Sequence, residues 1–278
     1  MIKDLVVNLS VAAEHDPAAE FALSVASAFA ARVVGVAFQS DPITPTALMD
    51  SMPPPPDLIE ALRMESERAA KAAASRFDGA AKLAFVSFET RVVTSSVAGA
   101  ASRFAEIARR FDLSVVAQAR PDALGAEALI VEQALFDSGR PVLVVPYIQT
   151  APFKVDRVML CWDGSRPAAR AAGDALPILS RAEAIEVLTI ESGKLKSDEI
   201  PGADIAEHLA HHGLNVTVTR TASGDVDVAN VILSHAADSG ADLIVMGGYG
   251  HSRLREFVLG GATRGILTSM TVPTLMSH

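Results

Sequence analysis

Residues 241–250 read Ala241-Asp242-Leu243-Ile244-Val245-Met246-Gly247-Gly248-Tyr249-Gly250, an apolar run that ends abruptly in glycines. A short run of large aliphatic side chains is typical of a strand that is buried on both faces of a parallel sheet. Glycine permits positive φ angles and lets a ligand approach the backbone closely. Because ligands of open parallel sheets bind beyond the carboxyl ends of the strands, this segment predicts both a fold class and the place of a site.

The same pattern occurs earlier in the chain. Residues 111–116, Phe111-Asp112-Leu113-Ser114-Val115-Val116, parallel residues 241–246, and Asp112 precedes Asp242 by 130 residues. Arg140-Pro141-Val142-Leu143 likewise parallels Val272-Pro273-Thr274-Leu275. Two matched segments in the same order indicate duplication. We therefore expect two domains, residues 1–149 and 154–278, joined by the short polar stretch 149–154.

Both halves alternate apolar strands with helical stretches, which predicts an α/β fold with two tandem Rossmann-like domains. Each domain is expected to hold a five-stranded parallel sheet with helices on both faces. Asp16 and Asp57 are expected to cap the helices that follow them. The predicted strands are 5–9, 33–38, 85–93, 113–117, 142–145, 157–162, 185–190, 215–220, 242–246 and 274–276. The predicted helices are 17–31, 58–77, 98–110, 167–179, 203–212, 226–239 and 262–270.

Composition narrows the function classes. Half of the 278 residues are hydrophobic and 21 % are charged, so a substantial core can form. A net charge of −9 argues against a general nucleic-acid binder. The single cysteine, Cys161, can form no internal disulfide, and we expect it to be a buried small residue of a protein in a reducing compartment. No apolar run reaches the roughly 18 residues of a membrane span, and residues 1–4 lack the basic region of a signal peptide, so we expect a cytoplasmic protein.

The glycine-rich loop predicts a cradle for phosphate groups. The helix expected after Gly260-Gly261 offers free N–H groups and a positive dipole end to an anion. Arg253 and Arg255 add positive charge, although both can equally be solvated surface residues. The loop lacks the lysine of a P-loop, and it lacks the third glycine of a dinucleotide fingerprint.

What matches is a longer spacing. Gly247, two residues, Gly250, nine residues and Gly260 resemble the ATP-binding signature of the universal stress protein family. Residues 158–165 (VMLCWDGS) resemble that family's first strand, and residues 241–247 and 273–275 resemble its fourth and last strands. The second half is thus identified as similar to this family throughout, and the first half resembles it in layout.

The resemblance implies an adenine nucleotide alpha hydrolase-like fold and a site for ATP, with or without Mg²⁺, in the second half. It places Asp163 beside the adenosine and the backbone of Ile190 at the adenine, and it puts the glycines at the ribose and the phosphates. It also implies that the last strands of the two domains pair, so that the chain is an intramolecular pseudo-dimer. The nucleotide-binding residues expected on this basis are Asp163, Ile190, Met246, Gly247, Gly250, Arg253, Gly260, Gly261, Ala262 and Thr263.

Two residues depart from the family pattern. The family usually has Ser or Thr directly after the last glycine, where this chain has Gly261. Losing one hydrogen bond to a charged group costs about 1.5–3 kcal/mol, and Thr263 is a candidate to compensate. Trp162 stands where the family has a small residue, and it can either stack on the adenine or fill its place. The glycine loop can also be an ordinary turn, and Asp163 can serve as a plain helix cap.

The first half lacks this equipment. Ala117, Gln118 and Arg120 stand where the second half has Gly247, Gly248 and Gly250, and Ser10 stands where it has Asp163. We expect a degenerate domain that keeps the fold without the nucleotide.

Three functions remain open. The first is a stress-response protein, regulatory or protective, that binds ATP or another adenine nucleotide in its second half. The second is a scaffold, or a sensor of another ligand, with an unidentified protein partner or further self-association. The third, a slow ATPase, lacks a placed base and a Walker lysine in the sequence. His208, His211 and His212 lie on one side of a predicted helix and are expected to be solvated.

Overall fold

The computed structural model describes residues 1–41, 55–120, 126–191, 202–248 and 261–278. Its strands are β1 (Asp4–Asn8), β2 (Arg32–Ser40), β3 (Ser87–Ser95), β4 (Leu113–Ala117), β5 (Val142–Val145), β6 (Arg157–Cys161), β7 (Ala184–Glu191), β8 (Val216–Ala222), β9 (Leu243–Gly247) and β10 (Thr274–Ser277). Its helices are α1 (Pro17–Phe29), α2 (Pro56–Leu83), α3 (Val97–Ala108), α4 (Ala126–Asp137), α5 (Arg166–Leu179), α6 (Ala203–His211), α7 (Val228–Ser239) and α8 (Gly261–Ser269).

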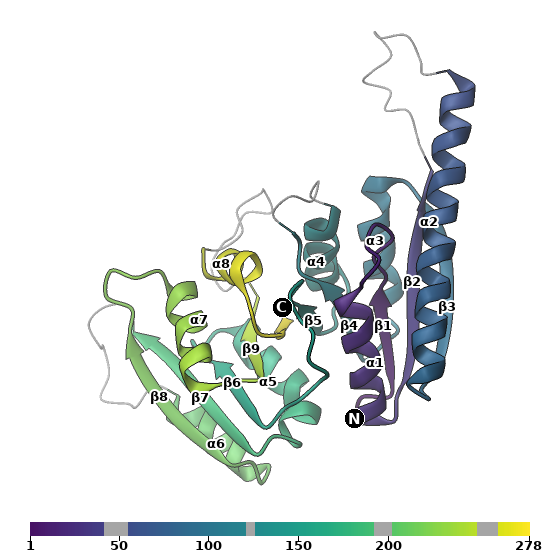
Figure 1. Cartoon of the computed structure of the whole chain (residues 1–278). Helices are drawn as coiled ribbons and strands as arrows, with labels where there is room; N and C mark the ends of the chain where they lie inside the picture. The colour runs from purple at the N-terminus through teal and green to yellow at the C-terminus, as the bar shows by residue number, and fades with distance from the viewer. Residues whose placement is uncertain (42–54, 121–125, 192–201, 249–260) are drawn as a thin grey trace.

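The strands of the described residues form one ten-stranded sheet in the order β3-β2-β1-β4-β5-β10-β9-β6-β7-β8 (Figure 1). Within each half the neighbouring strands are parallel, as the apolar runs predicted. The two halves meet where β5 pairs with β10 antiparallel, with Leu143 opposite Leu275. The expected pairing of the last strands is therefore confirmed, and it merges the two five-stranded sheets into one.

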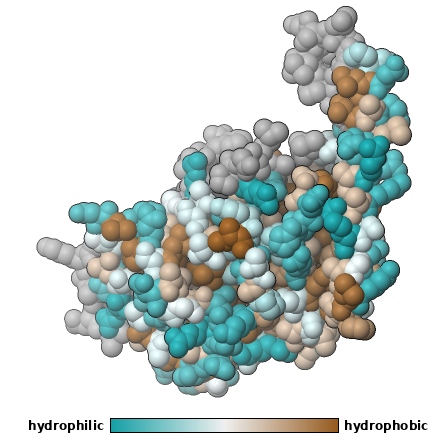
Figure 2. Space-filling view, in the orientation of Figure 1, coloured by the Kyte–Doolittle hydropathy of each residue, from teal (hydrophilic) through white to brown (hydrophobic). Residues whose placement is uncertain are grey.

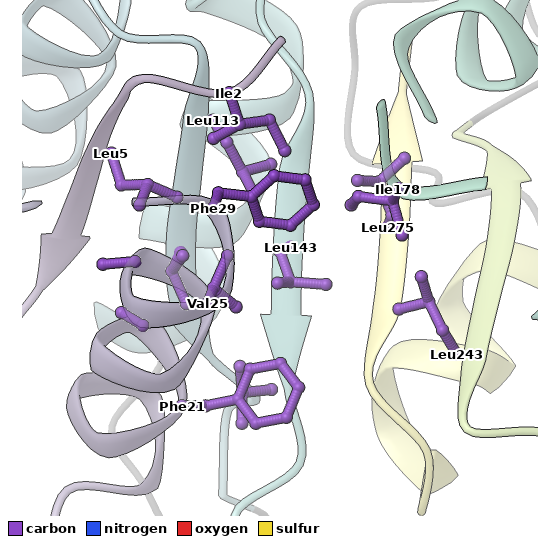
Figure 3. Packing of buried hydrophobic residues seen from close by; sticks show 14 of the residues in the cluster. Ile2, Leu5, Phe21, Val25, Phe29, Leu113, Leu143, Ile178, Leu243 and Leu275 are labelled. Atoms are coloured by element: carbon purple, nitrogen blue, oxygen red, sulfur yellow. The ribbon is translucent and has the colours of Figure 1, made fainter. Parts of the chain in front are cut away.

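Helices cover both faces of this sheet. Alternate strand residues point to opposite faces, so Leu5 and Val7 belong to one apolar layer and Val6 to the other. The first layer packs under α1, α2, α5 and α6, and the second packs under α3, α4, α7 and α8. Figure 3 shows the first layer running across the junction, with Phe29 and Leu143 on one side and Leu275 on the other. Each layer is therefore a single core shared by the two halves.

The segment between the halves is anchored on α1. The Phe153 ring lies 5.8 Å from that of Phe21 and 5.9 Å from that of Phe29, measured between centroids. Its backbone N–H donates to Ser24 Oγ over 2.7 Å. Aromatic contacts of this kind add to the burial of the rings, so the connecting segment is part of the core.

Two helix starts test the predicted caps. Asp16 caps α1 as expected, because its Oδ1 accepts from the Ala19 N–H at 3.1 Å and its Oδ2 from the Ser10 N–H at 2.7 Å. Burial nevertheless raises the pKa of Asp16 above its usual value. The prediction for Asp57 was wrong: the N-cap of α2 is Pro55, which makes no side-chain capping bond.

Helix α2 is longer than predicted and continues past Phe77 to Leu83. Figure 1 shows its first turns projecting beyond the sheet. Leu58, Leu62 and Met64 are 49 %, 52 % and 54 % exposed there, and Figure 2 shows an apolar patch at this end. Among the described residues no helix is long and apolar enough to cross a membrane.

Candidate functional site

The candidate site lies at the edge where β6, β7 and β9 end. In the sheet β6 lies between β9 and β7, so the connections that leave β6 and β9 diverge at this point. Such a reversal of strand order opens a crevice at the carboxyl ends of the strands. Asp163, Ile190 and Gly247 lie at or just after these three strand ends, and α8 begins at the same edge with Gly261. The fold therefore brings the described members of the predicted site to one edge.

The loop between β6 and α5 holds Asp163 in a tight turn. Its Oδ1 accepts the Ser165 N–H over 2.9 Å, and Gly164 between them has a φ of 72°. The N-cap of α5 is Ser165, whose Oγ accepts the Ala168 N–H at 3.3 Å. The alternative interpretation, in which Asp163 caps this helix, is therefore wrong. The carboxylate instead shapes the turn, and it is exposed at the edge.

Gly247 has a packing role that the sequence did not reveal. A Cβ built at Gly247 would lie 2.5 Å from the Ala168 N atom and 2.6 Å from the Pro167 carbonyl carbon. Both are backbone atoms of the first turn of α5, which cannot give way as a flexible side chain can. The absence of a side chain therefore lets α5 approach the end of β9 directly, whatever the edge binds.

The first turn of α8 presents a mixed surface. Gly261 is exposed, and a Cβ added to it would meet no atom of the described residues within 4 Å. Ala262 is half-buried, and Thr263 is only 4 % exposed. Free N–H groups and a positive dipole end make such a turn favourable for an anion. The expected compensating role of Thr263 stays a prediction.

The other predicted residues fall into two groups. Met246 is 5 % exposed and packs in the layer under α7 and α8, so it can meet a ligand only through its backbone. Ile190 is half-buried against the same layer. Gly250, Arg253 and Gly260 lie outside the described residues.

Trp162 and Cys161 sit beside this edge. Trp162 is half-buried against the layer under α5, and its backbone N–H donates to the Leu188 carbonyl at 2.9 Å. Cys161 is half-buried rather than fully buried, and desolvation raises the pKa of its thiol to about 12. A thiol with this pKa is a poor nucleophile, so Cys161 adds packing rather than reactivity.

The three histidines of α6 lie away from this edge. His208, His211 and His212 are all exposed, and the rings of His208 and His212 lie 5.0 Å apart. The predicted solvated face is therefore confirmed. Among the described residues no group of histidine, cysteine and carboxylate side chains has the arrangement to hold a metal ion.

Sequence reasoning missed a contact between the halves that reaches α8. The Gln118 amide is 1 % exposed, and its Nε2 donates to the carbonyls of Leu267 and Thr268, each at 3.1 Å. Its Oε1 accepts the Tyr147 N–H at 3.3 Å. The first half thus holds the last turn of the helix whose first turn belongs to the candidate site. The one available signal was the replacement of Gly248 by a polar residue in the repeat.

The sequence model described as the universal stress protein family matches residues 154–278. This match spans the second half of the chain. A search of curated proteins finds no sequence that matches.

Solved structures extend the likeness from these residues to the whole chain. A universal stress protein from Archaeoglobus fulgidus DSM 4304 superposes with a TM-score of 0.65 at 16 % identity, over 99 % of this chain and 97 % of that one. A protein described as functionally unknown, from Pseudomonas aeruginosa PAO1, gives a TM-score of 0.57 at 14 % identity, over 99 % and 92 %. At these identities the likeness concerns the fold, and it agrees with a tandem arrangement.

Proposed function

We propose that the second half binds ATP or another adenine nucleotide, and that the protein acts in the stress response as a regulatory or protective nucleotide-binding module of the cytoplasm. The observation that carries this proposal is the meeting of Asp163, Gly247 and the first turn of α8 at one edge, beside the reversal of strand order. The exposed Asp163 suits the sugar hydroxyls, and the N-terminus of α8 suits the phosphates.

We further propose that the first half, residues 1–149, is a partner domain without a nucleotide. In the first half, side chains of the same half hydrogen-bond the backbone of the corresponding loop, between β1 and α1. Arg76 Nη2 donates to the Ala13 carbonyl at 2.8 Å and to the Ser10 carbonyl at 3.4 Å, and Asp16 accepts the Ser10 N–H. These bonds hold backbone that a nucleotide would need to approach.

Position 261 offers a matched pair of variants for the test. Because a side chain there would meet none of the atoms that the structure describes, Gly261→Ser and Gly261→Asp should both fold. Serine restores the hydroxyl of the family and should tighten Mg-ATP binding by roughly tenfold to a hundredfold. Aspartate also suits a helix N-terminus, but its charge faces the phosphates and should abolish binding.

The measurement is a calorimetric titration of the full chain with Mg-ATP, with circular dichroism melts of both variants as the folding control. Wild-type protein should bind about one nucleotide per chain. If the Gly261→Asp variant binds as tightly as wild type, the phosphates do not bind at the N-terminus of α8. An absence of heat from wild type and Gly261→Ser at millimolar nucleotide would overturn the nucleotide proposal.

A second candidate function is a sensor of another ligand at the same edge. Trp162 favours it, because this large, half-buried residue directly precedes Asp163, where the family has a small residue. Trp162→Ala separates the two candidates: it should strengthen ATP binding if the indole obstructs the adenine, and weaken it if the indole stacks on it.

A further inference from the structure

A hollow lies at the opposite edge of the second half, where β6, β7 and β8 begin. Its volume is about 450 Å³, which lies within the range of small-molecule sites. It opens between the carboxyl end of α7 and the sheet. The residues that line it include Asp156, Arg157, Glu183, Ala184, Glu186 and Ser239.

The strand register shows what fills the corresponding place in the first half. Asp4 pairs with Arg32 just as Arg157 pairs with Ala184, and the next pairs inward are Leu5 with Leu113 and Val158 with Leu243. Ala184 is therefore the counterpart of Arg32. The Arg32 guanidinium lies 3.4 Å from Asp4 Oδ2 and also bonds the Glu89 carboxylate. One half fills this place with a bound guanidinium, and the other leaves a methyl group.

A second difference between the halves makes the wall of the hollow polar, because an apolar pair of residues in the first half corresponds to a polar pair in the second. Val34 and Phe104 are both fully buried in the first half. Their counterparts by register and by helix position are Glu186 on β7 and His235 on α7, whose Nε2 lies 2.8 Å from Glu186 Oε1. A half-buried carboxylate is costly to keep without a partner, so replacing an apolar pair by this pair indicates a use for the charge.

The charges around the hollow favour a cation. Three carboxylates line it, from Asp156, Glu183 and Glu186, against the single guanidinium of Arg157. Arg157 Nη1 already donates to the Ser239 carbonyl at 3.1 Å. Outside the lining, Lys154 is ion-paired with Asp156 at 2.6 Å and lies 3.7 Å from Asp242. The carboxyl end of α7 adds the negative end of a helix dipole.

We propose that this hollow is a second binding site, which takes a small organic cation with an alkylguanidinium or alkylammonium group. Glu186 and Glu183 accept from the cationic head. They do so from other positions than the two acceptors of Arg32, because the register counterparts of Asp4 and Glu89 in the second half are Arg157 and Thr217. The ligand occupies the place that Arg32 fills in the first half. The site is independent of the nucleotide proposal, because it lies at the other edge of the sheet and shares no residue with it.

The test is a calorimetric titration of the full chain with agmatine in nucleotide-free buffer. Agmatine should bind at one site per chain, and N-butylacetamide, a neutral molecule of similar length, should give no heat. Glu186→Gln should weaken agmatine binding about tenfold or more, since it removes the charge and keeps the shape. Ala184→Arg supplies the guanidinium from the chain itself and should abolish binding.

The control variant is Glu207→Gln, which removes an exposed carboxylate on α6 and should leave the affinity unchanged. Thermal melts of each variant report folding, and Glu186→Gln keeps the test decisive if Ala184→Arg does not fold. The proposal is overturned if millimolar agmatine gives no heat or if Ala184→Arg binds agmatine like wild type. Equal binding of N-butylacetamide would also overturn it.

Discussion

The carboxyl edges of the two halves are built on corresponding strands, but different residues follow those strands. In the second half β9 ends in Gly247 followed by Gly248, and in the first half β4 ends in Ala117 followed by Gln118. The glycines let α5 and the neighbouring half approach the backbone, whereas Gln118 sends an amide across the junction to α8. The two halves thus share a strand order and differ at this edge, with glycines after β9 and a buried amide side chain after β4.

The contacts across the junction show the same division. Gln118 of the first half reaches the α8 carbonyls of Leu267 and Thr268. Its counterpart Gly248 lies against Leu135 of α4, where an added Cβ would come 2.6 Å from Leu135 Cδ2. Corresponding positions therefore meet corresponding helices, once through hydrogen bonds and once through close apolar packing. The first half has become a support for the helix that begins the candidate site.

Gly247→Ala should have the largest effect on stability. Its methyl group would press on the α5 backbone, so we expect a loss of about 3 kcal/mol, near the upper end for overpacking. The matched control is Ala117→Gly at the corresponding position of the first half, which should cost about 0.5–1 kcal/mol. Urea unfolding of the two variants measures both values. Similar small losses at the two positions would show that the glycine is not needed for packing.

Gln118→Ala should have a smaller effect on stability. It removes three hydrogen bonds of a buried amide and leaves the Tyr147 N–H and two α8 carbonyls without this partner, so we expect a loss of about 2 kcal/mol. The control is Gln149→Ala, whose Nε2 bonds only the Ala151 carbonyl at the surface. Hydrogen exchange should also rise in the last turn of α8. Unchanged exchange there would contradict the supporting role of Gln118.

Much of the fold could be predicted from local patterns. Strands β4 and β5 have the bounds that their apolar runs predicted, because a strand buried on both faces leaves an unbroken aliphatic signal. Helix α4 was missed, since Ala128-Leu129-Ile130-Val131 is a continuous run rather than a helical spacing. Helix α2 ran past its predicted end because Gly79 is tolerated within it. Local patterns therefore failed where the apolar residues did not follow one period.

The candidate site was predicted less completely. The motif led to the carboxyl edge, but the packing of Gly247 on α5 depends on how a helix 80 residues earlier is placed. The capping role of Ser165, rather than Asp163, depends on the turn made by Gly164. The contact of Gln118 with α8 spans 150 residues and exists only because β5 and β10 pair. Such contacts follow from the tertiary arrangement, which no short stretch of sequence contains.

The most direct test of the account is hydrogen–deuterium exchange of the full chain with and without saturating Mg-ATP. The account predicts slower exchange at the second-half edge, in residues 163–168 and in the first turn of α8, and no change in residues 9–16 and 117–120 of the first half. Equal protection of both edges would contradict the division between the halves. Protection of the first half alone would reverse it.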